Sequence, residues 1–182
     1  MKSRILRTIY LVLLAVLLAS CGSSDTASPV RPSQKIGPMW VNRYGHTNAE
    51  FIWDHCDSRM TDAPGIQTTE CSVPEVDELW IGHGIRGVDK SQRDALWEAR
   101  TWELYIDGHE VDLPAFNIAD FDGGDGDQVY EFRLWRIRLR KIPQGDHTLR
   151  YVMHVHKEVE GDPDAKPVGT YELVVKFTYG EE

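Results

Sequence analysis

Along most of the chain, apolar residues recur at every second position, which is the period of a strand with one buried face. The clearest example covers residues 171–179, and the same alternation returns in residues 149–155 and 135–139. Further strand candidates cover residues 39–44, 51–53, 102–106 and 76–85, of which the last is weakened by two glycines. The pattern therefore predicts a protein that consists mainly of β-strands.

Turn signals separate several of these candidates. Pro143 and Gly145 lie between two of them and predict an antiparallel hairpin of residues 135–139 with 149–155. Asp107-Gly108 suits a two-residue hairpin turn, because both positions tolerate a positive φ. Apolar residues 130, 132 and 134 have the opposite phase to those from Trp135 onward, which predicts a bulge or a change of sheet there.

One short helix is expected. Ser91 can cap it, Asp94 follows three residues later, and residues 95–99 continue it. Strands joined by turns, without alternating helices, favour two packed antiparallel sheets. We therefore expect a mainly β fold, an antiparallel β-sandwich with one short helix.

The first residues have the order of a secretory signal. Lys2, Arg4 and Arg7 precede an apolar run over residues 9–18, and small residues follow. The alternative is an uncleaved membrane anchor, but a spanning helix needs about 20 apolar residues. Residues 1–20 are therefore expected to be a signal peptide.

The run Leu18-Ala19-Ser20-Cys21 resembles the lipobox of bacterial lipoproteins. The resemblance implies that the leader is removed and that the Cys21 thiol carries a diacylglycerol, whose two acyl chains hold a protein stably on a bilayer. The expected location is the extracytoplasmic face of the cell membrane, with the lipid bilayer as a partner through acylated Cys21. Polar residues 21–37 then form a lipidated flexible tether, and residues 38–182 form the domain.

Three segments resemble bacterial immunoglobulin-like domains. These segments are residues 102–111 (WELYIDGHEV), 142–151 (IPQGDHTLRY) and 169–175 (GTYELVV). The likeness covers about the last 80 residues, but the Cys…Trp…Cys spacing of antibody domains is absent. It implies an immunoglobulin-like β-sandwich with a binding or bracing role and no catalytic activity.

Charge and cysteine content limit the expected partners and predict a disulfide. Beyond the leader, 17 basic residues face 29 acidic ones, so the chain carries a net charge of −12, which disfavours nucleic acid as a partner. Once Cys21 is acylated, Cys56 and Cys71 remain, and outside the cytoplasm such a pair forms a disulfide. A disulfide with this loop length contributes about 3 kcal/mol to stability. A shared metal is the alternative, although the spacing matches no zinc pattern.

The acidic segment over residues 120–127 is the best candidate for a metal site. Four carboxylates on a glycine-rich loop could converge on calcium, namely Asp120, Asp122, Asp125 and Asp127. The segment departs from the EF-hand pattern, and the alternative is a solvated loop between strands. We therefore assign no metal or other cofactor.

Other polar groups are weaker candidates. His154 and His156 share one face of a strand and would need a third ligand, such as His147, His83 or His109, to hold a metal. Arg136, Arg138 and Arg140 form a basic stripe, which Arg150 could extend from a partner strand. The stripe could bind an anion or pair with acids on neighbouring strands. Tryptophan side chains could stack on sugar rings, although most are expected in the core.

No catalytic residues are predicted. Serines and histidines are scattered, and neither G-x-S-x-G nor H-E-x-x-H occurs. The expected function is therefore that of a membrane-tethered binding or structural lipoprotein, whose partner is an unidentified envelope protein or glycan. The alternative is a carbohydrate- or calcium-dependent adhesion module of the cell surface, and a hydrolase with an unrecognised site is a more distant one.

Overall fold

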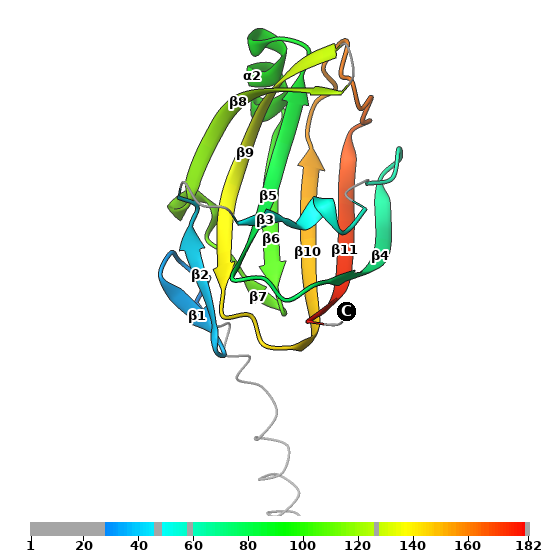
Figure 1. Ribbon diagram of the computed structural model, residues 1–182. Coiled ribbons are helices and arrows are strands. Elements are labelled where there is room, and N and C mark those ends of the chain that lie inside the picture. Colours follow the sequence, from blue (N-terminus) through cyan, green and yellow to red (C-terminus); the bar gives the residue numbers. More distant parts are fainter. Residues whose placement is uncertain (1–27, 46–48, 58–59, 126–127, 181–182) are drawn as a thin grey trace, which may run out of the picture.

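The computed structural model describes residues 28–45, 49–57, 60–125 and 128–180, which form two β-sheets packed face to face (Figure 1). The strands of the first sheet are β1 (Gln34–Ile36), β2 (Met39–Arg43), β9 (Gln128–Arg140), β5 (Glu78–Gly87), β3 (Glu50–Phe51) and β8 (Asn117–Asp125). Those of the second sheet are β4 (Gly65–Val73), β11 (Gly169–Tyr179), β10 (Gly145–Val155), β6 (Arg100–Ile106) and β7 (His109–Glu110). The prediction of a mainly β, sandwich-like fold is confirmed.

The core lies between the two sheets and follows the alternation of the sequence. Leu79 and Ile81 of β5 and Ile137 and Leu139 of β9 are at most 1% exposed. The second sheet contributes the alternating buried residues of β10 and β11, such as Leu149 and Val175. Burial of these apolar side chains is the main force that holds the two sheets together.

The sheets are mixed, and the expectation of purely antiparallel pairing is wrong at two places. Strand β4 runs parallel to β11, and the short β3 runs parallel to β5. Strand β4 begins inside the segment between the two cysteines and ends two residues after Cys71, in a stretch where the sequence predicts no strand. Its residues alternate between exposed and half-buried at the edge of the sheet, so they carry little apolar signal.

The predicted hairpin of residues 135–139 with 149–155 is also wrong. Strand β9 pairs with β5, β2 and β8, whereas β10 pairs with β6 and β11 in the other sheet. The connection therefore crosses the sandwich, and Ile142 within it is buried in the core. Pro143 and Gly145 mark a reversal of direction, but a reversal does not specify which sheet the next strand joins.

The Asp107-Gly108 hairpin is confirmed, because both residues have a positive φ and Ile106 pairs with His109. The helix is confirmed as α2 (Lys90–Glu98), but Asp89 caps it in place of Ser91 by accepting a hydrogen bond from the amide of Gln92. The expected break at residues 134–135 is absent, since β9 pairs with β5 without interruption from Glu131 to Arg140.

Part of the expected tether belongs to the fold. Val30 bridges to Val111 and is buried, and strand β1 pairs with β2. Arg31 also pairs with Asp112 at 2.8 Å. Strand pairing relies on backbone hydrogen bonds, which need no apolar side chains. The polar composition of this N-terminal stretch therefore gave no sign that it forms a strand.

Candidate functional site

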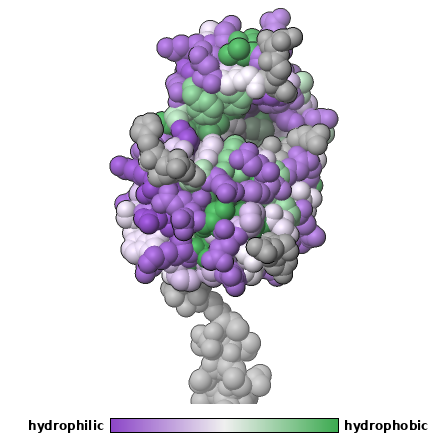
Figure 2. Space-filling view, in the orientation of Figure 1, coloured by the Kyte–Doolittle hydropathy of each residue, from purple (hydrophilic) through white to green (hydrophobic). Residues whose placement is uncertain are grey.

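An aromatic groove lies beside the open edge of β5. Strand β3 pairs only with Leu79 and Trp80, so along residues 81–87 no other strand of the described chain covers this edge. A groove of about 600 Å³ occupies the opening between this edge and the second sheet. Figure 2 shows the molecule hollowed there, in the upper half of the face, with apolar atoms around the hollow.

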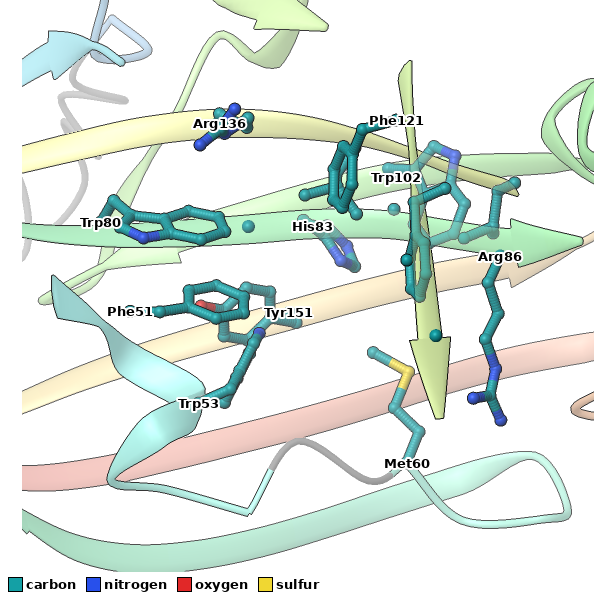
Figure 3. A pocket seen from close by; sticks show the side chains of 17 residues that line it. Phe51, Trp53, Met60, Trp80, His83, Arg86, Trp102, Phe121, Arg136 and Tyr151 are labelled. Atoms are coloured by element: carbon teal, nitrogen blue, oxygen red, sulfur yellow. The ribbon is translucent and has the colours of Figure 1, made fainter. Parts of the chain in front are cut away.

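Both sheets and the segment after β3 supply the walls. The apolar lining residues are Phe51, Trp53, Met60, Trp80, Ile85, Trp102, Phe121, Phe132, Leu134 and Tyr151. Phe51 stacks on Trp80 with ring centroids 3.5 Å apart, and Phe121 stacks on Phe132 at 5.2 Å. Trp53 is carried by the 3₁₀ turn η1 (Ile52–Asp54) and packs on Tyr151 at 5.1 Å (Figure 3).

Two glycines of β5, Gly82 and Gly84, border the groove and have no room for a larger side chain. A Cβ on Gly82 would lie 3.1 Å from the Leu134 side chain and 3.2 Å from the Trp80 side chain, so these two side chains leave little room for one on Gly82. A Cβ on Gly84 would lie 2.0 Å from the Arg133 carbonyl oxygen, so any side chain there would push β5 away from β9. Gly84 is therefore required for the close approach of these two strands.

Arg136 is the one cation of the lining without a carboxylate partner in the described part of the chain. Its guanidinium lies 3.6 Å from the ring centroid of Tyr44 and 4.8 Å from that of Trp80. The other lining arginine, Arg86, pairs with Asp164 at 3.1 Å and lies over Tyr130. Figure 3 shows the two arginines at opposite ends of the groove.

Three buried polar atoms of the lining have no hydrogen-bond partner among the described residues. They are the Tyr151 hydroxyl, the Trp102 Nε1 and the Arg136 Nε. Burial raises the pKa of Tyr151 well above its ordinary value, so this hydroxyl keeps its proton. Polar atoms of this kind are costly to bury, and a ligand that reached them would recover hydrogen bonds.

His83 lies at the inner side of the groove and is neutral at pH 7. Burial lowers its pKa from 6.5 to about 4, against hydrogen bonds to the backbone of Val152 and Glu103 that raise it. Its Nε2 donates to the Val152 carbonyl at 3.0 Å, and its ring packs edge-on against Trp102 and Tyr151. With Nε2 donating to a carbonyl, only Nδ1 could bind a metal, and among the described residues His83 belongs to no group of three or more metal-ligating side chains.

The predicted disulfide is present. Cys56 and Cys71 are bonded, with Cα atoms 5.4 Å apart. The bond ties the segment after η1 to edge strand β4. It therefore anchors, from outside the groove, the stretch of chain that carries Trp53.

The acidic segment is a strand and not the loop that the sequence predicts, because residues 117–125 pair with β9 as β8. Arg133 holds the carboxylate of Asp120 at 2.7 and 2.8 Å, and Arg93 lies 3.3 Å from it. Asp122 is exposed, the side chain of Asp125 is not described, and Asp127 lies outside the described residues. The described residues contain no group of three or more metal-ligating side chains.

The residues of the predicted histidine pair and arginine stripe each contact different partners. His154 contacts Glu103 at 3.0 Å and His156 contacts Thr101 at 2.8 Å. Arg138 and Arg140 both pair with Glu78 of the neighbouring strand, whereas Arg136 belongs to the groove. Arg150 lies in the other sheet, where it pairs with Glu172, so it does not extend the stripe.

The sequence contained one unrecognised signal for the groove. Phe132 and Leu134 are apolar in the phase opposite to the core residues of β9, which suggests a strand that changes sheets. The structure shows that both lie on the face of β9 away from Trp135 and line the groove. Strand β9 is apolar on both faces because one face packs on the core and the other lines the groove.

Comparisons with known proteins identify no family for this chain. No family model matches it, and no curated protein matches. Among solved structures, a cysteine protease inhibitor from Entamoeba histolytica is similar over 63% of this chain and 95% of its own, with 14% identity and a TM-score of 0.22. A likeness of this strength supports no argument about this protein, whose family stays unassigned.

Proposed function

We propose that the protein is an extracytoplasmic binding protein, held on the cell membrane by a lipid on Cys21, which binds its ligand in the aromatic groove without catalysis. The observation that carries the proposal is the groove itself, with its aromatic walls, its glycine positions and Arg136, which has no carboxylate partner among the described residues. Grooves that are largely apolar and contain a few polar groups are the usual form of ligand sites.

The chemistry of the lining supports binding in preference to catalysis. Of the lining residues, only His83, Arg86, Arg136 and Tyr151 carry titratable groups, and none is a serine, cysteine or carboxylate. A nucleophile with an adjacent base, or a pair of acids, would be needed for most hydrolytic mechanisms. His83 already donates to a backbone carbonyl and resists protonation.

The membrane attachment is proposed from the leader and the lipobox-like run before Cys21. No helix in the described ranges is long and apolar enough to cross a bilayer. The proposal also treats the sandwich as immunoglobulin-like, on the residues that resemble such domains. The acylated cysteine would then be the point that holds the domain at the membrane.

Mass spectrometry of the purified full chain and of a Cys21→Ser variant tests the attachment. The wild-type chain should begin at Cys21 with a mass increase that matches a diacylglycerol, and it should fractionate with membranes. The Cys21→Ser chain should lack the lipid. An intact Met1 terminus with a free thiol at Cys21 would contradict the proposal.

Binding in the groove can be tested with the anionic aromatic dye 1-anilinonaphthalene-8-sulfonate. Its fluorescence should rise with the folded protein, and Arg136→Met should weaken binding several-fold. Arg138→Met is the matched control, because Arg138 lies on the same strand but pairs with Glu78. Equal binding by wild type and both variants would indicate that the groove is not the site.

A glycan is the competing class of ligand, because aromatic side chains also stack on sugar rings. Trp80, however, has Phe51 stacked on it and the Arg136 guanidinium near it, which reduces the aromatic surface available to a sugar.

A further inference from the structure

We infer that the groove takes an extended, partly acidic peptide segment of a partner protein, which adds as a strand to the open edge of β5. The inference rests on the proposed binding function and specifies its ligand. Addition of a strand to a free sheet edge is a recurring mode of peptide recognition, in which main-chain hydrogen bonds give affinity and side-chain pockets give specificity.

The first argument is the consecutive lining by β5. Gly82, His83, Gly84, Ile85 and Arg86 all border the groove, although neighbouring side chains of a strand point to opposite faces. Five consecutive residues can line one groove only if the edge of the backbone itself faces it. The groove therefore presents main-chain groups as well as side chains to its occupant.

The second argument is the state of that edge. Among the described residues, β3 is the only strand on this side of β5, and it ends at Phe51 opposite Trp80. Backbone donors and acceptors beyond that point form a ready template for another strand. At about 3.3 Å per residue, the five lining positions would accommodate about five residues of an extended peptide.

The third argument concerns the faces on either side of the added strand. On one side lie the inner residues Trp53, Tyr151 and Trp102, and on the other lie Trp80, Leu134 and Phe132. Both sides are therefore apolar. A peptide with apolar residues at its centre would bury side chains in both directions, whereas a uniformly polar chain would gain little.

The fourth argument is charge. The whole chain has a formal net charge of −9, yet the groove is lined by two arginines and by no aspartate or glutamate. Arg86 is already paired with Asp164, which leaves Arg136, opposite Gly82 in the register of β9 and β5. An acidic side chain of the peptide near Gly82 would meet this guanidinium, with which a carboxylate forms strong hydrogen bonds.

The experiment is selection from a phage-displayed library of random heptapeptides on the purified full chain in detergent. We expect enrichment of sequences with central apolar residues and at least one aspartate or glutamate. Synthetic copies should quench tryptophan fluorescence, because three tryptophans line the groove. No enrichment over a blank surface, or enrichment of basic sequences, would overturn the inference.

Two comparisons then test the geometry. A copy of the best peptide that is N-methylated at alternate amides, in either of the two possible phases, removes donors on one edge, and one of the two should bind at least tenfold more weakly. Arg136→Gln should weaken an acidic peptide at least fivefold and its Glu→Gln copy much less, and Arg138→Gln should change neither. Melting curves verify that each variant is folded.

The outcomes separate this inference from the proposed function. If neither N-methylated copy loses affinity, strand addition is excluded whatever the effect of the arginine variants. If no peptide binds but a chitin or mannan oligosaccharide does so in an Arg136-dependent manner, the peptide ligand is wrong and the binding groove stands. If neither peptides nor oligosaccharides bind, and the dye binds wild type and Arg136→Met equally, then both the peptide inference and the proposed binding function are wrong.

Discussion

The imidazole of His147, at the start of β10, lies 2.8 Å from the carboxylate of Asp107 in the turn after β6. Its second nitrogen faces the Pro143 carbonyl at 2.8 Å, and the amide of Thr148 donates to the other oxygen of Asp107. When the imidazole is charged, both of its nitrogens donate. The pair thus joins the connection that crosses the sandwich to a hairpin turn.

This contact predicts a pH-dependent contribution to stability. The hydrogen bond that His147 donates to Asp107 raises the pKa of His147, so the stabilisation by the charged imidazole is complete below about pH 6.5 and is lost as the pH rises through the folded-state pKa. For Asp107, burial raises the pKa, but hydrogen bonds from His147 and Thr148 together lower it. The stabilisation of the fold by the ionised Asp107 carboxylate is present above about pH 4 and is lost as the pH falls further. His147→Gln should therefore cost more stability at pH 5.5 than at pH 9 in urea denaturation, and an equal cost at both values would refute the charged pair.

His83 predicts the opposite dependence. Burial lowers its pKa to about 4, so acid favours the unfolded chain, in which the imidazole protonates near pH 6.5. Between those two values the folded state should lose up to about 3 kcal/mol from this residue alone. The stability difference between wild type and His83→Gln should shrink on acidification from pH 7 to pH 4, measured by urea denaturation. A constant difference would show that His83 titrates normally.

Arg93 holds together the helix and the β8–β9 hairpin. It is 2% exposed and lies 2.8 Å from Asp94, 3.3 Å from Asp120 and 3.0 Å from Glu131. Its carboxylate partners are 31–41% exposed, so water can solvate them once Arg93 is removed, and the loss of its charged hydrogen bonds costs about 2–3 kcal/mol. Arg93→Gln should lower the free energy of unfolding by this order. Arg140→Gln, at a half-exposed pair with Glu78, is the control and should cost less than about 1 kcal/mol.

Gly84 should tolerate no side chain. Since its Cβ would lie 2.0 Å from a backbone oxygen of β9, Gly84→Ala forces the two strands apart. Overpacking of this kind costs about 3 kcal/mol or prevents folding. Gly45→Ala is the matched control, because nothing lies within 4 Å of its Cβ, and its melting temperature should stay near that of wild type. Similar melting temperatures for both variants would contradict the close approach.

Calcium should not stabilise the protein. The carboxylate of Asp120 is engaged by Arg133, whose hydrogen bond lowers its pKa, so it has little capacity left for a cation. Calorimetry with millimolar calcium and then with excess EDTA should give the same melting temperature. A rise of several degrees with calcium would revive the calcium-dependent adhesion module as the function.

The sequence predicts what depends on local pattern. Strict alternation located β11, β10 and the buried half of β9, and Asp107-Gly108 located a hairpin because its backbone conformation is a local property. It could not assign β9 and β10 to different sheets, since both alternate in the same way. It also missed β4, whose pairing with β11 relies on backbone hydrogen bonds more than on apolar side chains.

The groove was harder to foresee, because it depends on where a strand stops. Nothing in residues 50–57 indicates that β3 ends after Phe51 and leaves the rest of the β5 edge open. In the sequence, Gly82 and Gly84 indicate only a weakened strand. The spacing of Arg136, Arg138 and Arg140 predicts one basic stripe, although Glu78 pairs only with the latter two.

If Cys21 carries a lipid, the bridge between Val30 and Val111 limits how far the domain can move from the membrane. Only eight residues separate Cys21 from Val30, and even when fully extended they reach about 30 Å. With the lipid in place, the domain would move within a thin layer above the bilayer, with the end that carries β1 lowest (Figure 1) and the groove in the opposite half of the domain (Figure 2). Partners would then have to approach from the aqueous side or from a facing surface, and those confined to the same layer would meet it at a raised local concentration.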